Sequence, residues 1–145
     1  MAAPASLTIL VAEDNADDVA LLRRAFANAQ LPHQLRVVSS DVEVVDYLEG
    51  NSAYRDREAF PLPSVLLLDL GLPQGGGLDL LRWLGSSPNF RDLPVVVLTG
   101  SDKDEKEAIA LGADDFYVKP ADAADLVRIF QDINTNWLSP RTPEL

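Results

Sequence analysis

Residues 65–69 read Val-Leu-Leu-Leu-Asp, an unbroken apolar run that ends in a carboxylate. Short continuous apolar runs are typical of strands that are covered on both faces, as in a parallel sheet. Three other runs have the same form, and the residues that follow them are Glu13-Asp14, Thr99 and Lys119-Pro120. Open parallel sheets bind ligands at the carboxyl ends of their strands, so we expect these end residues to share one pocket.

The rest of the chain supplies further strands and the helices that cover them. Apolar runs predict strands at 7–12, 35–38, 65–69, 95–99 and 116–118. Helical spacing predicts helices at 16–29, 41–49, around 78–84, at 102–111 and at 122–137. This alternation predicts an α/β, doubly wound, five-stranded parallel sheet with five helices, and we expect the flavodoxin-like strand order 2-1-3-4-5. In that order the first and third strands are neighbours, so Glu13, Asp14 and Asp69 should meet.

Turn and cap residues mark the segments between these elements. Asp41 and Asp102 are expected to cap the helices that follow them, and Gly112 to take the left-handed conformation at a helix end. The glycines between Gly71 and Gly77 are expected to form a flexible turn. Residues 50–64 are polar with two prolines and predict a long loop, which on a compact scaffold often forms a contact surface.

The bulk composition fits one globular domain. The chain has 145 residues, which we interpret as a single domain with a core at about 7–137, a short tail at 138–145 and no room for an output domain. Its net charge is −11, from 12 basic and 23 acidic residues, so it should repel nucleic acid and anionic membranes. It has no cysteine, residues 1–6 lack the basic region of a leader peptide, and no apolar run approaches membrane-spanning length, so a cytoplasmic location is expected.

Three of the strand-end residues are acids, and their proximity has a chemical consequence. Each residue alone has an ordinary explanation: Asp14 as a helix cap, Asp69 as a strand-ending acid, Thr99 as a β-branched strand residue and Lys119 as a solvated charge. A cluster of like-charged carboxylates, however, needs a compensating cation. Mg²⁺, a hard ion that prefers oxygen ligands, fits best.

Five sites follow one another in order along the chain: the Glu13-Asp14 pair, Asp69 with Pro73 four residues later, Gly77, Thr99 and Lys119-Pro120. Together they resemble the receiver domain of two-component response regulators, and the resemblance covers about residues 7–137. It implies a phosphorylation-dependent signalling switch that is not an enzyme acting on other substrates.

The resemblance also implies roles for the acidic residues. Asp69 would be the nucleophile that takes a phosphoryl group from a histidine kinase or phosphotransfer protein, and its place after a central apolar strand agrees with that role. Asp14, Asp69 and the backbone carbonyl of Gly71 would bind Mg²⁺ directly, and Glu13 would act through a bound water.

The other matching residues would recognise the phosphoryl group and transmit its presence. Lys119 would pair with one phosphate oxygen, and Thr99 would donate its hydroxyl to another. Phe116 stands at the switch aromatic position of the family, with an ordinary core phenylalanine as the alternative. Pro120 resembles the cis-proline of the family, with a simple strand terminator as the alternative.

Some positions depart from common family residues. Gly71 replaces a frequent asparagine, and Ser101 is likewise short, so the lifetime of the phosphate is not predicted. Phe116 replaces the commoner tyrosine and has no hydroxyl to satisfy on burial.

Two features bear on partners. The loop at Tyr54–Pro63 and the Trp137-Leu138 pair are similar to single-domain receivers that partner phytochrome-type sensor histidine kinases. Val127, Phe130 and Leu138 form a second apolar stripe on the last helix, for which we weigh scattered surface hydrophobics against a partner surface. A homodimer through the predicted helix at 102–111, strand at 116–118 and helix at 122–137 would use that stripe.

Three rival functions remain. A phosphohydrolase of the haloacid dehalogenase type uses similar residues, but it carries a second aspartate where this chain has Gly71. A receiver-like scaffold that is never phosphorylated is the second rival. Chemistry at His33 is the third, and it is weak because no cysteine or second histidine is present to join it.

Overall fold

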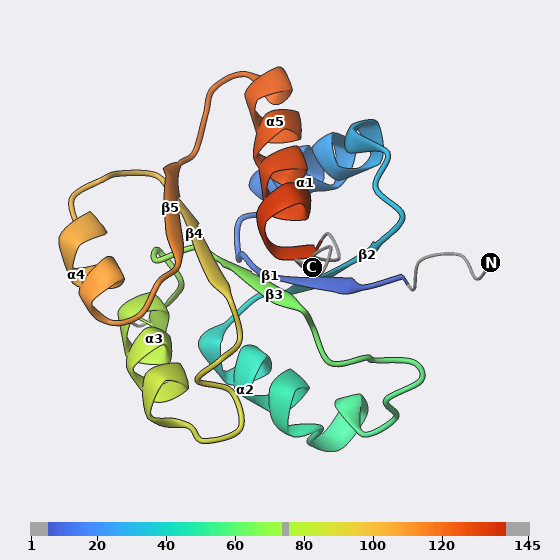
Figure 1. Ribbon diagram of the computed structural model, residues 1–145, viewed down its shortest axis with the longest axis vertical. Helices are drawn as coiled ribbons and strands as arrows, with labels where there is room; N and C mark the ends of the chain where they lie inside the picture. Colours follow the sequence, from blue (N-terminus) through green and yellow to red (C-terminus); the bar gives the residue numbers. More distant parts are fainter. Residues whose placement is uncertain (1–5, 74–75, 139–145) are drawn as a thin grey trace, which may run out of the picture.

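The predicted parallel sheet and its strand order are confirmed. The structure, a computed structural model, describes residues 6–73 and 76–138. Its five parallel strands are ordered β2-β1-β3-β4-β5 (Figure 1). They are β1 (Thr8–Ala12), β2 (Gln34–Val38), β3 (Val65–Leu68), β4 (Val95–Thr99) and β5 (Asp115–Val118). The predicted tail beyond residue 138 and Gly75 of the predicted turn lie outside the described residues.

Helices cover both faces of this sheet. They are α1 (Ala16–Ala29), α2 (Asp41–Glu49), α3 (Gly76–Ser86), α4 (Glu105–Ala110) and α5 (Ala123–Ile133), with a 3₁₀ turn η1 (Ser52–Tyr54) and a π-helical turn η3 (Asn134–Leu138). In Figure 1, α1 and α5 lie on one side of the sheet, and α2 and α3 lie on the other. No helix in the two described ranges is long and apolar enough to cross a membrane.

The central strands are apolar along their whole length because both of their faces are buried. Alternate residues of a strand point to opposite faces. Ile9 and Val11 belong to the hydrophobic cluster under α1 and α5, whereas Leu10 and Ala12 belong to the cluster under α2 and α3. The edge strands β2 and β5 are more exposed than β1, β3 and β4.

The cap of α2 and the start of α4 differ from the sequence prediction. Ser40, not Asp41, caps α2, because its hydroxyl accepts a hydrogen bond from Glu43 N at 3.1 Å. The fourth helix begins at Glu105 rather than after Asp102. There the Ser101 hydroxyl accepts a hydrogen bond from Lys103 N, which stabilises a turn over residues that were predicted to be helical. Gly112 has the predicted positive φ, at 110°.

The predicted flexible turn before α3 is wrong at Gly76 and Gly77, which are buried in the first turn of the helix. A Cβ at Gly77 would lie 2.5 Å from the Cα of Leu70. Glycine is therefore required there for close packing of the helix against the chain that leaves β3.

The predicted second apolar stripe of the last helix is also corrected. Phe130 and Leu138 are buried, and the ring of Phe130 meets that of Phe26 of α1 edge to face, with centroids 5.4 Å apart. Val127 and Trp137 are only partly buried. Phe130 packs against α1 because α1 and α5 lie side by side on the same face of the sheet, so the predicted stripe is not an exposed apolar surface.

The segment after α2 is an internally packed unit rather than a plain polar loop. Arg57 donates hydrogen bonds to the carbonyls of Tyr47, Leu48 and Phe60 at 2.8 to 3.1 Å. These bonds satisfy carbonyls at the end of α2 and tie the loop to it. Its long form is confirmed, and its use as a contact surface stays a prediction.

Candidate functional site

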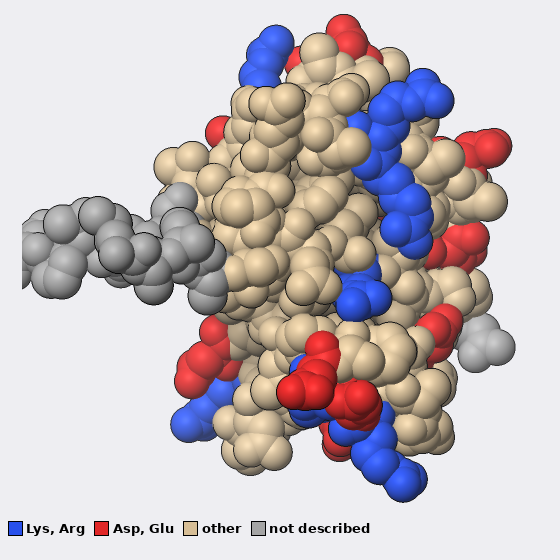
Figure 2. Space-filling view, turned by 90° about the vertical axis from the view of Figure 1, so that its right-hand side faces the viewer, with Lys and Arg blue, Asp and Glu red and all other residues tan. Residues whose placement is uncertain are grey.

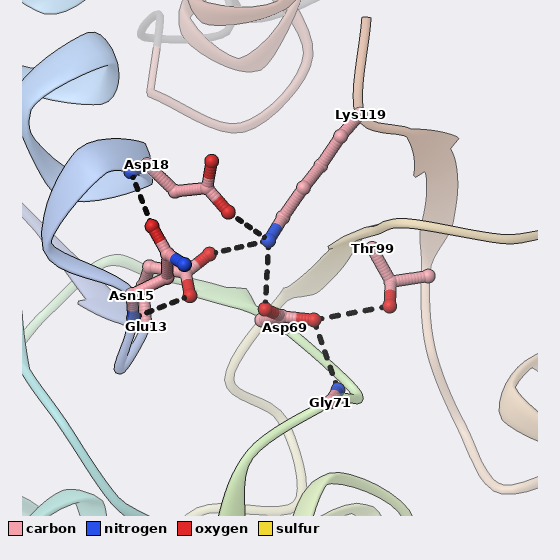
Figure 3. Close-up of polar contacts among 7 residues, drawn as sticks. All are labelled: Glu13, Asn15, Asp18, Asp69, Gly71, Thr99 and Lys119. Carbon is pink, nitrogen blue, oxygen red and sulfur yellow. Dashed lines mark hydrogen bonds and ion pairs between the residues drawn. The ribbon is translucent and has the colours of Figure 1, made fainter.

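The backbone of the sheet holds the strand-end residues in place. The ladder continues one residue beyond the strands: Asp69 N donates to the Ala12 carbonyl at 3.1 Å, and Glu13 N donates to the Val38 carbonyl at 3.0 Å. On the other side, Lys119 N donates to the Thr99 carbonyl at 2.7 Å. The predicted convergence of Glu13, Asp69, Thr99 and Lys119 is confirmed (Figure 3).

Asp69 is the centre of the site. Its side chain is almost fully buried, and both of its carboxylate oxygens accept hydrogen bonds. Oδ1 accepts from the Thr99 hydroxyl at 3.0 Å and from Gly71 N at 2.9 Å. Oδ2 accepts from Lys119 Nζ at 2.8 Å. Residues from three different strand ends therefore fix the orientation of this one carboxylate.

The ammonium of Lys119 joins three carboxylates. Its Nζ lies 2.7 Å from Glu13 Oε1, 2.7 Å from Asp18 Oδ2 and 2.8 Å from Asp69 Oδ2. An ammonium has three donors, so all of them are used. One positive charge faces three negative charges, which leaves the site net negative.

Asp18 is a member of this site that sequence reasoning did not find. It lies in the first turn of α1, where Asn15 caps the helix by accepting a hydrogen bond from Asp18 N at 2.9 Å. Asn15 N in turn donates to Glu13 Oε2 at 3.1 Å. The available signal was its place in the first turn of the helix that directly follows the Glu13-Asp14 pair.

The electrostatic surroundings change the pKa values of the buried groups in opposite directions. Burial raises the pKa of Glu13, and the hydrogen bonds from Lys119 and Asn15 only partly oppose it. Burial also acts to raise the pKa of Asp69, but the hydrogen bonds from Lys119 and Gly71 outweigh it, so the pKa of Asp69 is lowered. Burial acts to lower the pKa of Lys119, but its three carboxylate partners raise it above the ordinary value. Asp69 and Lys119 are therefore both charged near neutral pH.

The acidic residues have the donor set of a hard divalent cation. Glu13, Asp14 and Asp69 each offer a carboxylate oxygen, and these oxygens lie within 4.8 Å of one another. Asp14 is exposed, whereas Glu13 and Asp69 are buried. An oxygen-only donor set that is accessible from one side fits Mg²⁺ or Mn²⁺.

The remaining predicted residues lie around this centre. The Lys119-Pro120 peptide bond is trans, as is every peptide bond among the described residues, so the predicted cis-proline is wrong. The trans form is favoured by about 0.5–1 kcal/mol before proline. Phe116 is half-buried and packs against the cluster under α2 and α3. A Cβ at Gly71 would lie 3.4 Å from Asp69 Oδ1, an ordinary contact, so a side chain would fit there.

The strand order and the residues at the carboxyl edge of the sheet are those of a known family. A receiver domain has a parallel sheet of order 2-1-3-4-5, and its site contains an acidic pair, a buried aspartate, a lysine and a threonine. All of these are present here. The family described as the response regulator receiver domain matches residues 9–131. This chain belongs to that family and is a receiver domain of two-component signalling.

Within this family, the chain is similar to several response regulators of known structure. Response regulator Rcp1 of Synechocystis is 30% identical over 137 residues, which cover 92% of this chain and 90% of Rcp1, and its structure has been determined in an Mn²⁺-bound form. Response regulator RPA3017, of red light signalling in R. palustris, has a TM-score of 0.86 at 33% identity and covers 96% of this chain and 99% of its own. The phosphorylated cyanobacterial phytochrome response regulator RcpA has a TM-score of 0.82 at 32% identity and covers 95% of this chain and 98% of its own. The similarity to phytochrome-associated response regulators, expected from the sequence, is confirmed.

Proposed function

We propose that this chain is a switch in which Asp69 accepts a phosphoryl group from a sensor histidine kinase or a phosphotransfer protein. The observation that carries the proposal is the Asp69 carboxylate itself, which is held by Thr99, Gly71 and Lys119 at the end of the central strand β3. An Asp69 oxygen would form the new bond to phosphorus while the bond from phosphorus to the donor nitrogen breaks. The nitrogen leaves with the electron pair of that bond, and an acyl phosphate remains on Asp69.

The charge state of Asp69 supports this role. Its lowered pKa keeps the carboxylate ionised, and only the ionised form is a nucleophile. Lys119 already donates to one Asp69 oxygen and Thr99 to the other. After transfer, each could donate instead to a phosphoryl oxygen, which would stabilise the added charge. Movement of Thr99 would signal that a phosphoryl group is present, with Phe116 as the proposed side chain that follows it.

The metal proposal rests on the same residues. Asp14, Asp69 and the carbonyl of Gly71 would hold Mg²⁺, with Glu13 acting through a bound water. When bound, the ion offsets the negative charge that builds on the transferring phosphoryl oxygens. The Mn²⁺-bound form of Rcp1 supports this choice of cation.

Two rival functions fit the residues of the site less well. A phosphohydrolase needs an acid two residues after the nucleophile, and Gly71 cannot supply one. A scaffold that is never phosphorylated would not need the buried, fully hydrogen-bonded carboxylate of Asp69. We therefore propose that the chain modifies only itself and passes the signal to a partner by conformational change.

The first prediction tests the phosphoacceptor directly. With Mg²⁺ and acetyl phosphate, the wild-type protein is expected to gain one phosphate, and Asp69→Asn is expected to gain none, because an amide is not a nucleophile. Intact-protein mass spectrometry measures the added mass. Asp92→Asn is a matched control, since Asp92 is exposed and precedes β4 at the opposite end of the sheet. Equal labelling of wild type and Asp69→Asn would refute the assignment, and steady release of phosphate from an external phosphomonoester would favour the hydrolase.

The kinase proposal follows from the relatives. RcpA is described as a phytochrome response regulator and RPA3017 as part of red light signalling. We therefore propose a phytochrome-type histidine kinase as the phosphoryl donor. A side-by-side panel of purified kinases, compared by the rate of transfer to this chain, tests it, and faster transfer from unrelated sensors would contradict it.

A further inference from the structure

A surface pocket lies along β2, the edge strand beside β1. Its cavity has a volume of about 210 Å³. The residues that line it are Arg23, Leu35–Val38, Tyr47, Tyr54 and Phe60. It contains none of the residues assigned above to phosphoryl chemistry.

One wall of this pocket is a rigid group of aromatic rings. The ring centroids of Tyr47 and Tyr54 are 5.0 Å apart, and those of Tyr54 and Phe60 are 5.1 Å apart. The hydroxyl of Tyr47 donates to the Pro61 carbonyl, and that of Tyr54 donates to Glu43, both at 2.8 Å. Because both hydroxyls are engaged elsewhere, the wall offers ring carbon to a ligand, and it is already ordered before binding.

Arg36 of β2 gives the pocket a positive charge and hydrogen-bond donors, which the aromatic wall does not offer. Its guanidinium lies over the ring of Phe60, 5.7 Å from the centroid. Nη2 donates to the Ala59 carbonyl at 2.9 Å and to Gln34 at 3.3 Å. Its Nε is buried and has no hydrogen-bond partner among the described residues. A buried donor without an acceptor costs about 1–3 kcal/mol, so an acceptor that reached Nε from the pocket would be favoured.

The lining of the pocket contains two arginines, Arg23 and Arg36, and no acidic residue. Residues 19–40 contain no aspartate or glutamate, although the chain has 23 such residues, and they include Arg23, Arg24 and Arg36. Neither Arg23 nor Arg36 forms an ion pair within the described part of the chain. Figure 2 looks onto the side where α1 ends and β2 begins; basic side chains lie along its upper right and at its centre, and acidic side chains lie along the edges and at the lower centre.

We propose that this pocket binds a small aromatic carboxylate. The carboxylate would accept from Arg36 Nε and pair with Arg23, and the ring would lie against Tyr54 and Phe60. Both parts are needed, because guanidinium groups bind carboxylates through charge-assisted hydrogen bonds and aromatic rings favour offset or edge contacts. This ligand site is additional to the phosphoacceptor function and does not depend on it.

Benzoate is the probe for the test, and the amide resonances of Leu35–Val38 are the readout in an NMR titration of the full chain. Saturable shifts at these amides are expected. Arg23→Gln is expected to weaken benzoate binding roughly tenfold, since a charge-assisted contact contributes about 1.5 kcal/mol or more. Arg23 is exposed, so this variant should fold. Arg24→Gln removes the same charge from the adjacent position of α1, which does not line the pocket, and should leave binding unchanged.

Two further probes separate the parts of the proposed ligand. Benzyl alcohol keeps the ring without the charge, and inorganic phosphate keeps negative charge without the ring; both should bind more weakly than benzoate. Absence of saturable benzoate shifts would overturn the proposal. Equal losses in Arg23→Gln and Arg24→Gln, or phosphate or benzyl alcohol binding as tightly as benzoate, would overturn it as well.

Discussion

At the scale of single residues, the ammonium of Lys119 organises the site. It lies within 2.8 Å of an oxygen from each of Glu13, Asp18 and Asp69. It acts to lower the pKa of both buried carboxyls. At Asp69, which also accepts from Gly71 and Thr99, this lowering outweighs burial, whereas burial dominates at Glu13. Two acids in one pocket thus differ in how readily they hold a proton.

This difference predicts the order of titration in metal-free protein. The pKa of Asp69 should lie below its ordinary value of 3.8, and that of Glu13 above its ordinary value of 4.5. Because the pKa of Asp69 is lower in the folded protein, its contribution to stability is present above pH 3.8 and is lost as the pH falls through the folded pKa. The raised pKa of Glu13 has the opposite sign, so protonation of Glu13 favours the folded state. Carboxyl ¹³C shifts measured against pH report both values.

The variants Glu13→Gln and Asp69→Asn assign the two titrations, since each removes one curve. Asp92→Asn should leave both curves in place. A titration of Asp69 at higher pH than Glu13 would contradict the predicted order.

At the scale of elements, the close approach of α3 to the end of β3 determines how the chain leaves Asp69. Gly77 allows it, because any Cβ at that position would overlap the backbone of Leu70, the residue after Asp69. By contrast, a Cβ at Gly85 in the same helix would meet only the Leu111 carbonyl, at 3.6 Å. Two glycines of one helix therefore have different roles.

The corresponding prediction uses both glycines. Gly77→Ala should lower the free energy of unfolding by about 1–3 kcal/mol, because backbone atoms must move to admit the methyl group. Gly85→Ala should leave it unchanged or raise it by up to about 1 kcal/mol, through the better helix propensity of alanine. Urea unfolding followed by circular dichroism gives both values. Equal effects of the two substitutions would show that the contact at Leu70 is unimportant.

At the scale of the whole molecule, the two helical layers complete the core. The layer of α1 and α5 buries Phe130 completely and brings it against Phe26. Phe130→Ala should therefore lower the free energy of unfolding by about 3–5 kcal/mol, as expected for a buried phenylalanine. Val127→Ala, at a half-buried position of the same helix, should cost much less. If the two substitutions had similar small effects in urea unfolding, Phe130 would not be part of the core.

The burial of this stripe also changes the dimer hypothesis. A homodimer through α4, β5 and α5 stays a proposal, now supported by the exposed apolar side chains of Ile109 in α4 and Val118 in β5, which are 47% and 46% exposed. Ile109→Glu should then lower the molar mass of any dimer to that of the monomer in light scattering of the phosphorylated protein. Leu21→Glu, an exposed leucine of α1, is the control. An unchanged dimer in Ile109→Glu would place the contact elsewhere.

Much of the fold was predictable because its signals are local. The run Val65–Leu68 is apolar throughout since both faces of β3 are covered, and α1 was predicted with its observed bounds. The start of the fourth helix was missed, because Ser101 forms a competing turn through a hydrogen bond that composition does not reveal. The stripe with Phe130 was misinterpreted, because helical spacing shows that a second apolar face exists but not which element covers it.

The sheet, its strand order and the strand-end residues that converge at its carboxyl edge were predictable from the sequence, because strand periodicity and chain order constrain the topology of a parallel sheet. The pairing of those residues with one another was not predictable and follows from the packed fold. Three features depend on distances between side chains from different elements. They are the ion pair of Asp18 with Lys119, the opposite pKa shifts of Glu13 and Asp69, and the pocket beside β2. Such distances arise only when the elements pack, because electrostatic and hydrogen-bond energies depend on separation and burial, which have no signature in any single segment.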